Sequence, residues 1–184
     1  MGIQIENPVT RQRLTFLEAS DEVFRMSGVF SPGGFAGPLH VHPLQTERFE
    51  VRSGTGGFQV NGRRLTLVAD QAVDVPAGTA HTFWNAGDDD FEAVMEFRPG
   101  LPTSTRRFYE AYFGLSVAGR TNAAGMPNLW QVAVEMPRMQ AHVRLARPPW
   151  PVQRLALGAI RPFATLLGYR PFNIDELRTP GATI

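Results

Sequence analysis

Three of the chain's four histidines and one glutamate lie close together in the first half of the sequence. His40 and His42 are two residues apart, so in an extended strand their side chains project from the same face. Glu47 follows a Pro-Leu-Gln-Thr link that can turn the chain, and His81 follows the turn-forming segment Pro-Ala-Gly-Thr-Ala. If these side chains converge, three imidazoles and one carboxylate would form a site for a first-row transition metal.

The strand that begins at Glu47 gives local support for such a site. Glu47, Phe49 and Val51 alternate with charged residues and therefore share one apolar face. A carboxylate buried on an apolar face is costly unless it has a partner. A metal ion would be such a partner.

The spacing of these residues resembles the two motifs of the cupin superfamily. The first motif reads G, five residues, H-x-H, three or four residues, E, six residues and G, and the chain matches it from His40 to Gly54, although Gly37 stands too close to His40. The second reads G, five residues, P-x-G, two residues, H, three residues and N. The chain matches the second motif, with Asp70 at its leading glycine, at Pro76, Gly78, His81 and Asn85.

The resemblance implies a cupin-type β-barrel or jelly roll that binds one divalent transition metal, either Fe, Mn, Ni, Cu or Zn, through His40, His42, Glu47 and His81. Octahedral coordination by four residues would leave two positions for substrate, water or dioxygen. The alternative is a metal-free set of hydrogen-bonded core residues. The side chains expected to line a pocket around the site are mostly apolar: Phe49, Val51, Val75, Phe83, Asn85 and Met95.

The rest of the sequence indicates a β-rich domain followed by helices. Short alternating segments run to residue 100, and Asn61-Gly62 between two of them is a strong hairpin signal. Many short antiparallel strands suit a closed barrel or jelly roll. We therefore expect a cupin β-barrel domain over residues 1–100 and a helical C-terminal extension over 101–184, packed on the barrel or on a partner subunit.

Helical periodicity replaces alternation in the second part of the chain. It predicts helices over 105–117, 128–143 and 152–169, with Pro137 interrupting the second. His142 lies in this part, away from both motifs, and we interpret it as a surface or packing residue. The extension also offers more apolar surface than a small barrel requires, which favours a homodimer; the apolar residues concerned are Phe108, Tyr112, Trp130 and Leu155.

Charge is divided unevenly between the two parts. Residues 1–100 carry 8 Arg against 13 Asp and Glu, a net −5, and residues 101–184 carry 10 Arg against 4, a net +6. The opposite net charges of the two parts favour docking of the extension on the barrel. Arg154 and Arg161 share one face of the last predicted helix, so a peripheral membrane contact stays open as an alternative.

Composition excludes several classes of protein. The chain has no cysteine, which excludes disulfides and thiolate ligands, and its start lacks the features of a signal peptide, so a cytoplasmic location is expected. No apolar run approaches the roughly 20 residues of a transmembrane helix. We find no nucleic-acid-binding motif.

Two functions from different classes fit these features. The first is a metal-dependent oxygenase, similar to the quercetinase-like small cupins, that acts on a small organic substrate such as an aromatic compound. The second is a non-catalytic protein that binds a small molecule in its barrel. A third interpretation is a metal-free structural relic. No general acid–base pair is evident beyond the proposed ligands, which keeps the binding protein open.

Overall fold

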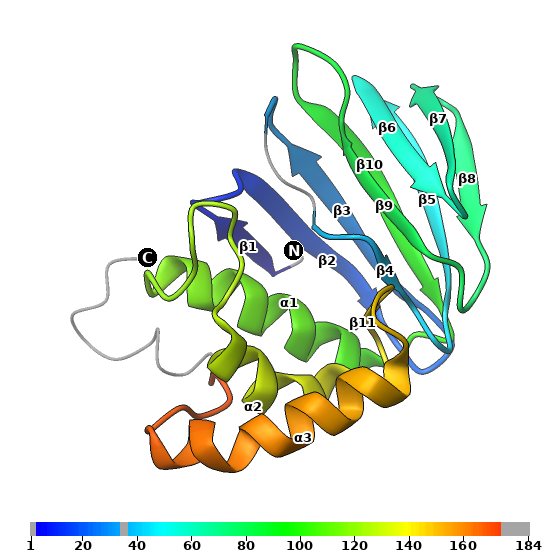
Figure 1. Cartoon of the computed structure of the whole chain (residues 1–184). Coiled ribbons are helices and arrows are strands. Elements are labelled where there is room, and N and C mark those ends of the chain that lie inside the picture. The colour runs from blue at the N-terminus through cyan, green and yellow to red at the C-terminus, as the bar shows by residue number, and fades with distance from the viewer. Residues whose placement is uncertain (1–2, 34–36, 174–184) are drawn as a thin grey trace.

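A computed structural model of the chain describes residues 3–33 and 37–173 (Figure 1). Two antiparallel sheets make up the first part of this structure. The larger sheet has the strand order β1 (Gln4–Asn7), β2 (Gln12–Ala19), β3 (Phe24–Phe30), β10 (Phe91–Arg98), β5 (Thr46–Ser53) and β8 (Ala72–Val75). The smaller sheet has the order β11 (Arg144–Leu145), β4 (His40–Val41), β9 (His81–Asn85), β6 (Thr55–Val60) and β7 (Arg63–Val68). The predicted mainly β architecture is confirmed.

Alternation in the strands places apolar side chains between the two sheets. In β10 every second residue from Phe91 to Phe97 is buried, and Met95 pairs with Met26 of β3 on one side and Phe49 of β5 on the other. Phenylalanine rings from both sheets fill this core, with edge or tilted contacts such as that between Phe49 and Phe83, whose centroids are 4.9 Å apart. Burial of these rings is a main favourable contribution to the fold.

The expected hairpin joins β6 to β7. Asn61 and Gly62 have φ angles of 49° and 78°, which are the left-handed values that a two-residue type I′ turn requires at both central positions. The strands beside the turn pair in register from Val60↔Arg63 to Thr55↔Val68.

The described residues after β10 form three helices, α1 (Pro102–Val117), α2 (Leu129–Met139) and α3 (Trp150–Leu166), with β11 between the last two. The Asn128 side chain caps α2 by accepting a hydrogen bond from the Gln131 backbone N–H at 3.0 Å. The second helix ends before the predicted residue 143, because the backbone N–H groups of His142 and Val143 both bond to the Met139 carbonyl and the chain turns into β11. Pro137 lies inside the last turns of α2.

The helices lie together on one side of the strands, with α1 beside β1 and α3 outermost (Figure 1). Phe113 of α1 belongs to the barrel core, and β11 extends the smaller sheet by pairing with β4. The predicted boundary at residue 100 falls in the turn between β10 and α1. Residues 174–184, the end of the predicted extension, lie outside the described residues. None of the described helices is long and apolar enough to cross a membrane.

Candidate metal centre

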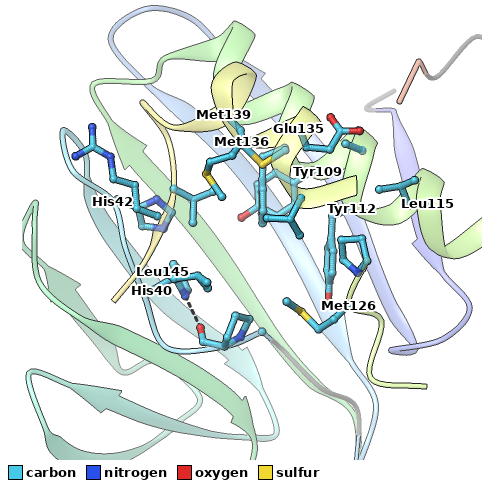
Figure 2. A pocket seen from close by; sticks show the side chains of 18 of the residues that line it. His40, His42, Tyr109, Tyr112, Leu115, Met126, Glu135, Met136, Met139 and Leu145 are labelled. Carbon is cyan, nitrogen blue, oxygen red and sulfur yellow. Dashed lines mark hydrogen bonds between the residues drawn. The ribbon is translucent and has the colours of Figure 1, made fainter. Parts of the chain in front are cut away.

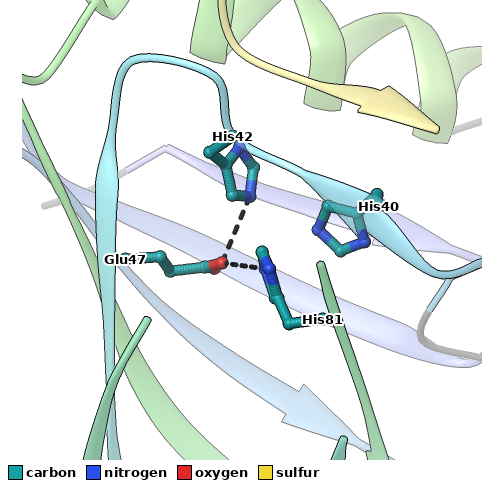
Figure 3. A group of neighbouring side chains, drawn as sticks. All are labelled: His40, His42, Glu47 and His81. Carbon is teal, nitrogen blue, oxygen red and sulfur yellow. Dashed lines mark hydrogen bonds and ion pairs between the residues drawn. The ribbon is translucent and has the colours of Figure 1, made fainter. Parts of the chain in front are cut away.

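The structure brings the four predicted ligands together (Figure 3). One ligand atom from each of His40, His42, Glu47 and His81 lies within 4.8 Å of the others. His40 is on β4 and pairs directly with His81 on β9, while Glu47 enters from β5 in the opposite sheet. The cluster therefore joins both sheets, and the short loop after β4 supplies His42.

Glu47 is the centre of the cluster. Its Oε2 lies 2.8 Å from His81 Nε2 and 3.1 Å from His42 Nε2. Glu47, His42 and His81 are buried, with exposed fractions of 2%, 3% and 1%, whereas His40 is only partly buried. Charged groups at such burial are found only with partners, because desolvation is otherwise too costly.

A backbone carbonyl fixes the orientation of each of the three imidazoles in the cluster. The Nδ1 atom of His40 is 2.9 Å from the Pro38 oxygen, that of His42 is 2.6 Å from the His142 oxygen, and that of His81 is 2.9 Å from the Thr79 oxygen. A carbonyl can only accept, so each Nδ1 carries the proton and each Nε2 is left as the potential metal-binding atom.

This arrangement suits a cation at the centre. His42 Nε2 is buried without a hydrogen-bond partner and faces the Glu47 carboxylate. Two lone pairs that face each other repel, so without a cation the cluster has to hold extra protons. Neutral imidazoles and a carboxylate, with their donor atoms turned inward, fit Fe, Mn, Ni, Cu or Zn in the +2 state.

The electrostatics of the cluster favour the metal-binding protonation state at His40 and Glu47 and oppose it at His81. Burial, together with the neighbouring His81 and His42, lowers the pKa of His40 to about 3. Burial acts to raise the pKa of Glu47, but His42 and His81 outweigh burial and hold it well below its usual value. Burial acts to lower the pKa of His81, whereas the hydrogen bond and charge of Glu47 raise it overall. At neutral pH Glu47 is therefore ionised and His40 is neutral, as metal ligands must be.

An apolar cavity of about 150 Å³ adjoins the cluster (Figure 2). His40, His42 and Glu47 line it from the barrel, together with Phe83 and Met95. Much of the remaining wall comes from the helical extension and the loop between α1 and α2: Phe108, Tyr109, Tyr112, Leu115, Met126, Val132, Met136 and Met139. An apolar space of this size can hold a molecule about as large as benzene.

The other side chains predicted to line a pocket lie elsewhere. Phe49, Val51 and Val75 are buried in the barrel core rather than on the cavity wall, because aromatic rings fill the barrel interior on their side of the cluster. Asn85 links the end of β3 to the loop between β9 and β10: its Nδ2 donates to the Phe30 oxygen at 2.8 Å and to the Asp89 oxygen at 2.7 Å. The helices supply the wall that these residues were expected to form.

His142 contacts the cluster, and sequence reasoning missed it. It is completely buried, which excludes the surface position and agrees with the packing position that we considered, and its ring centroid lies 4.5 Å from that of His42. The two residues are 100 positions apart in the chain. No local pattern connects them; the only signal was a histidine at an apolar stretch of a predicted helix.

Comparison with known proteins agrees with this fold and these motifs. Residues 27–97 match the family model of the cupin domain. The match spans β3 to β10 and includes all four residues of the cluster. Residues 27–97 therefore form a cupin domain.

Individual relatives differ in how much of the chain they cover. A probable oxidoreductase, virH, of Hypocrea virens is 29% identical over 157 residues, which is 80% of this chain and 71% of that protein. A mannose-1-phosphate guanylyltransferase of Klebsiella pneumoniae is 33% identical over 69 residues, but these are 38% of this chain and 14% of that protein.

Solved structures resemble the chain over about half its length. An RmlC-like cupin from Shewanella frigidimarina is 18% identical, with a TM-score of 0.49 over 55% of this chain and 86% of that one. A predicted oxalate decarboxylase from Thermotoga maritima is 20% identical, with a TM-score of 0.48 over 53% of this chain and 91% of that one.

Proposed function

We propose that the protein is a metal-dependent oxygenase that acts on a small, largely apolar organic substrate such as an aromatic compound. The observation that carries this proposal is the position of the cluster: His40, His42 and Glu47 line an apolar cavity large enough for an aromatic ring. The similarity to a protein named as a probable oxidoreductase supports a redox function.

In this proposal His40, His42, Glu47 and His81 hold the metal ion. When bound, the metal would act as a Lewis acid and as the site at which dioxygen or a substrate oxygen is activated. The inward-facing Nε2 atoms and the ionised Glu47 are already arranged for it, so little reorganisation accompanies binding.

The cavity wall would select and orient the substrate. Its methionine and aromatic side chains exclude water and favour an apolar molecule over a polyanion. Tyr109 adds a hydroxyl to the wall. Burial, followed by the charge of Glu47, raises the pKa of Tyr109 well above its usual value, so the phenol stays protonated and serves as a hydrogen-bond donor rather than a base.

A non-catalytic binding protein is the second candidate. The observation that favours it is the composition of the cavity wall, which is mostly apolar, with Tyr109 held in its protonated form and Glu135 as the one carboxyl group outside the cluster among the described residues that line it. General acid–base catalysis usually requires a group whose pKa lies near the working pH. Such a protein would bind the same class of molecule without consuming dioxygen.

Dioxygen uptake distinguishes these two functions. We expect wild-type protein loaded with each candidate metal in turn to consume dioxygen with at least one member of a panel of small phenols and diketones. Glu47→Gln, prepared identically, should consume little or none. If the metal-loaded wild type binds members of the panel, measured by calorimetry, but consumes no dioxygen with any of them, the binding protein replaces the oxygenase.

We also propose that two copies associate through α3. This helix packs on α2 and leaves large apolar side chains in solvent: Leu155 is 77% exposed, Phe163 is 62% exposed and Leu166 is 84% exposed. By helical periodicity these three lie on one face, with Arg154 and Arg161 on the opposite side. Two such faces can meet without bringing the arginines together. Of the residues first considered, Phe108 and Tyr112 instead line the cavity.

Light scattering tests this association. The wild type should give the mass of two chains at micromolar concentration, and Leu155→Arg should give one, because a cation within an apolar interface is strongly unfavourable. Val68→Arg is the matched control, since Val68 is exposed on β7, and should remain a dimer. A wild type with the mass of one chain would contradict the proposal, and its sedimentation with anionic vesicles would indicate a peripheral membrane contact instead.

A further inference from the structure

The loop of the metal cluster and the helical extension meet in a buried contact. His42 donates a hydrogen bond from Nδ1 to the backbone oxygen of His142 at 2.6 Å. Two residues further on, β11 pairs with β4, so that Leu145 lies opposite His40. Figure 3 shows β11, in yellow, beside the strand that carries His40. One short segment of the extension therefore contacts both histidines of the H-x-H motif.

The side chain of His142 is itself held by hydrogen bonds. Its Nδ1 lies 2.7 Å from Gln45 Oε1 and 3.2 Å from Thr105 Oγ1. Gln45 stands between His42 and Glu47 in the sequence, and its Nε2 donates to the oxygens of Pro99 and Gly100 at 2.8 and 3.0 Å. Because the amide nitrogen is used in this way, Oε1 is the acceptor and His142 Nδ1 is the donor.

Packing alone does not account for a histidine at this position. The rings of Phe97, Phe108 and Tyr109 surround His142 at centroid distances of 5.2, 5.2 and 5.9 Å. Its Nε2 is buried with no hydrogen-bond partner, which carries a desolvation cost. An apolar side chain would avoid that cost, so the hydrogen bond from Nδ1 to Gln45 is the feature that only a polar residue provides.

We propose that His142 is a positioning residue of the metal centre: its hydrogen bond to Gln45 fixes the backbone carbonyl that holds His42 with Nε2 toward the metal. This inference rests on the metal site proposed above. A partner on the outer nitrogen of a metal-binding imidazole fixes its tautomer and orientation, and losing such a partner typically weakens metal binding 10- to 100-fold.

Three substitutions at His142 separate positioning from packing. His142→Ala should weaken binding of Zn(II) and Co(II) at least tenfold, within the range for lost outer partners. His142→Asn can still donate to Gln45 and should recover most of that affinity. His142→Leu fills the space without donating and should bind as weakly as His142→Ala. Gln131→Ala is the matched control, because it removes a buried amide of α2 that bonds to Glu135 and Arg170, and it should retain wild-type affinity.

A second readout needs no metal. In the proton NMR spectrum of metal-free protein, the hydrogen-bonded Nδ1 proton of His42 should give a slowly exchanging low-field resonance in the wild type and in His142→Asn. Solvent exchange should broaden or remove it in His142→Ala and His142→Leu. This measurement tests the positioning role even if the wild type binds no metal, an outcome that would overturn the proposed function separately.

Two results would overturn the inference. The first is full metal affinity in His142→Leu together with loss in His142→Asn, which would assign the residue to packing. The second is a His42 Nδ1 resonance that is absent from the wild type or unchanged in His142→Ala. Circular dichroism of each variant shows whether it is folded, and His142→Asn provides the comparison if His142→Ala is not.

Discussion

Glu47→Gln is expected to weaken metal binding at least tenfold, about 1.4 kcal/mol. Glutamine preserves the size of the side chain but removes the negative charge that lies 2.8 Å from His81 Nε2 and 3.1 Å from His42 Nε2. Metal that binds only the folded state raises the melting temperature. Added Zn(II) should therefore raise the melting temperature of the wild type much more than that of Glu47→Gln, as measured by calorimetry.

Comparing the metal-induced shifts of the wild type and Glu47→Gln also distinguishes a metal site from a metal-free polar core. If Glu47 were merely a buried carboxylate bonded to protonated imidazoles, added metal would shift neither melting temperature. Equal shifts in the two proteins would remove Glu47 from the ligand set and reduce the site to three histidines. Arg48→Gln is a suitable control, because Arg48 is the next residue in β5 and pairs with Asp74 on the exposed face. Its metal-induced shift should equal that of the wild type.

Gly54→Ala is expected to be strongly destabilising although it lies outside the cluster. Gly54 follows β5 directly and has a φ of 72°, which costs an alanine about 1–2 kcal/mol. A Cβ at this position would also lie 2.4 Å from the backbone oxygen of Asp90, and backbone cannot move aside as a flexible side chain can. We expect a loss of about 3 kcal/mol or more in the free energy of unfolding, at the upper end of ordinary single substitutions.

Gly62→Ala is the matched control for this prediction. Gly62 has a similar φ of 78°, but an added Cβ would meet nothing within 4 Å. Only the conformational cost then applies, about 1 kcal/mol. Denaturant unfolding of both variants measures the difference. Equal losses would mean that the contact with Asp90 relaxes and that Gly54 is selected for its φ alone.

Much of the cluster could be predicted because its signals are local. The two-residue spacing of His40 and His42, the alternation that begins at Glu47 and the turn before His81 each depend on neighbouring residues. The Asn61-Gly62 turn is equally local. Strand pairing then brings these segments together in the register that the alternation of buried side chains requires.

The cavity and its supports could not be predicted in the same way. Tyr109 and Met136 lie in two segments with helical periodicity, which predicts a buried face for each helix but not what that face covers. The hydrogen bond between His42 and His142 joins residues 100 positions apart and depends on the docking of the whole extension. Phe49 and Val51 share a face with Glu47, as expected, but that face continues into a filled aromatic core.

Metal analysis of the purified protein tests the central claim most directly. Protein prepared without chelator, or dialysed in turn against Fe(II), Mn(II), Ni(II), Cu(II) and Zn(II), should retain close to one transition-metal ion per chain, and His42→Ala should lose most of it. The prediction requires both results, because His42 presents its Nε2 to the centre while its Nδ1 is held by His142. Wild-type protein that remains empty after dialysis against all five metals would contradict the account.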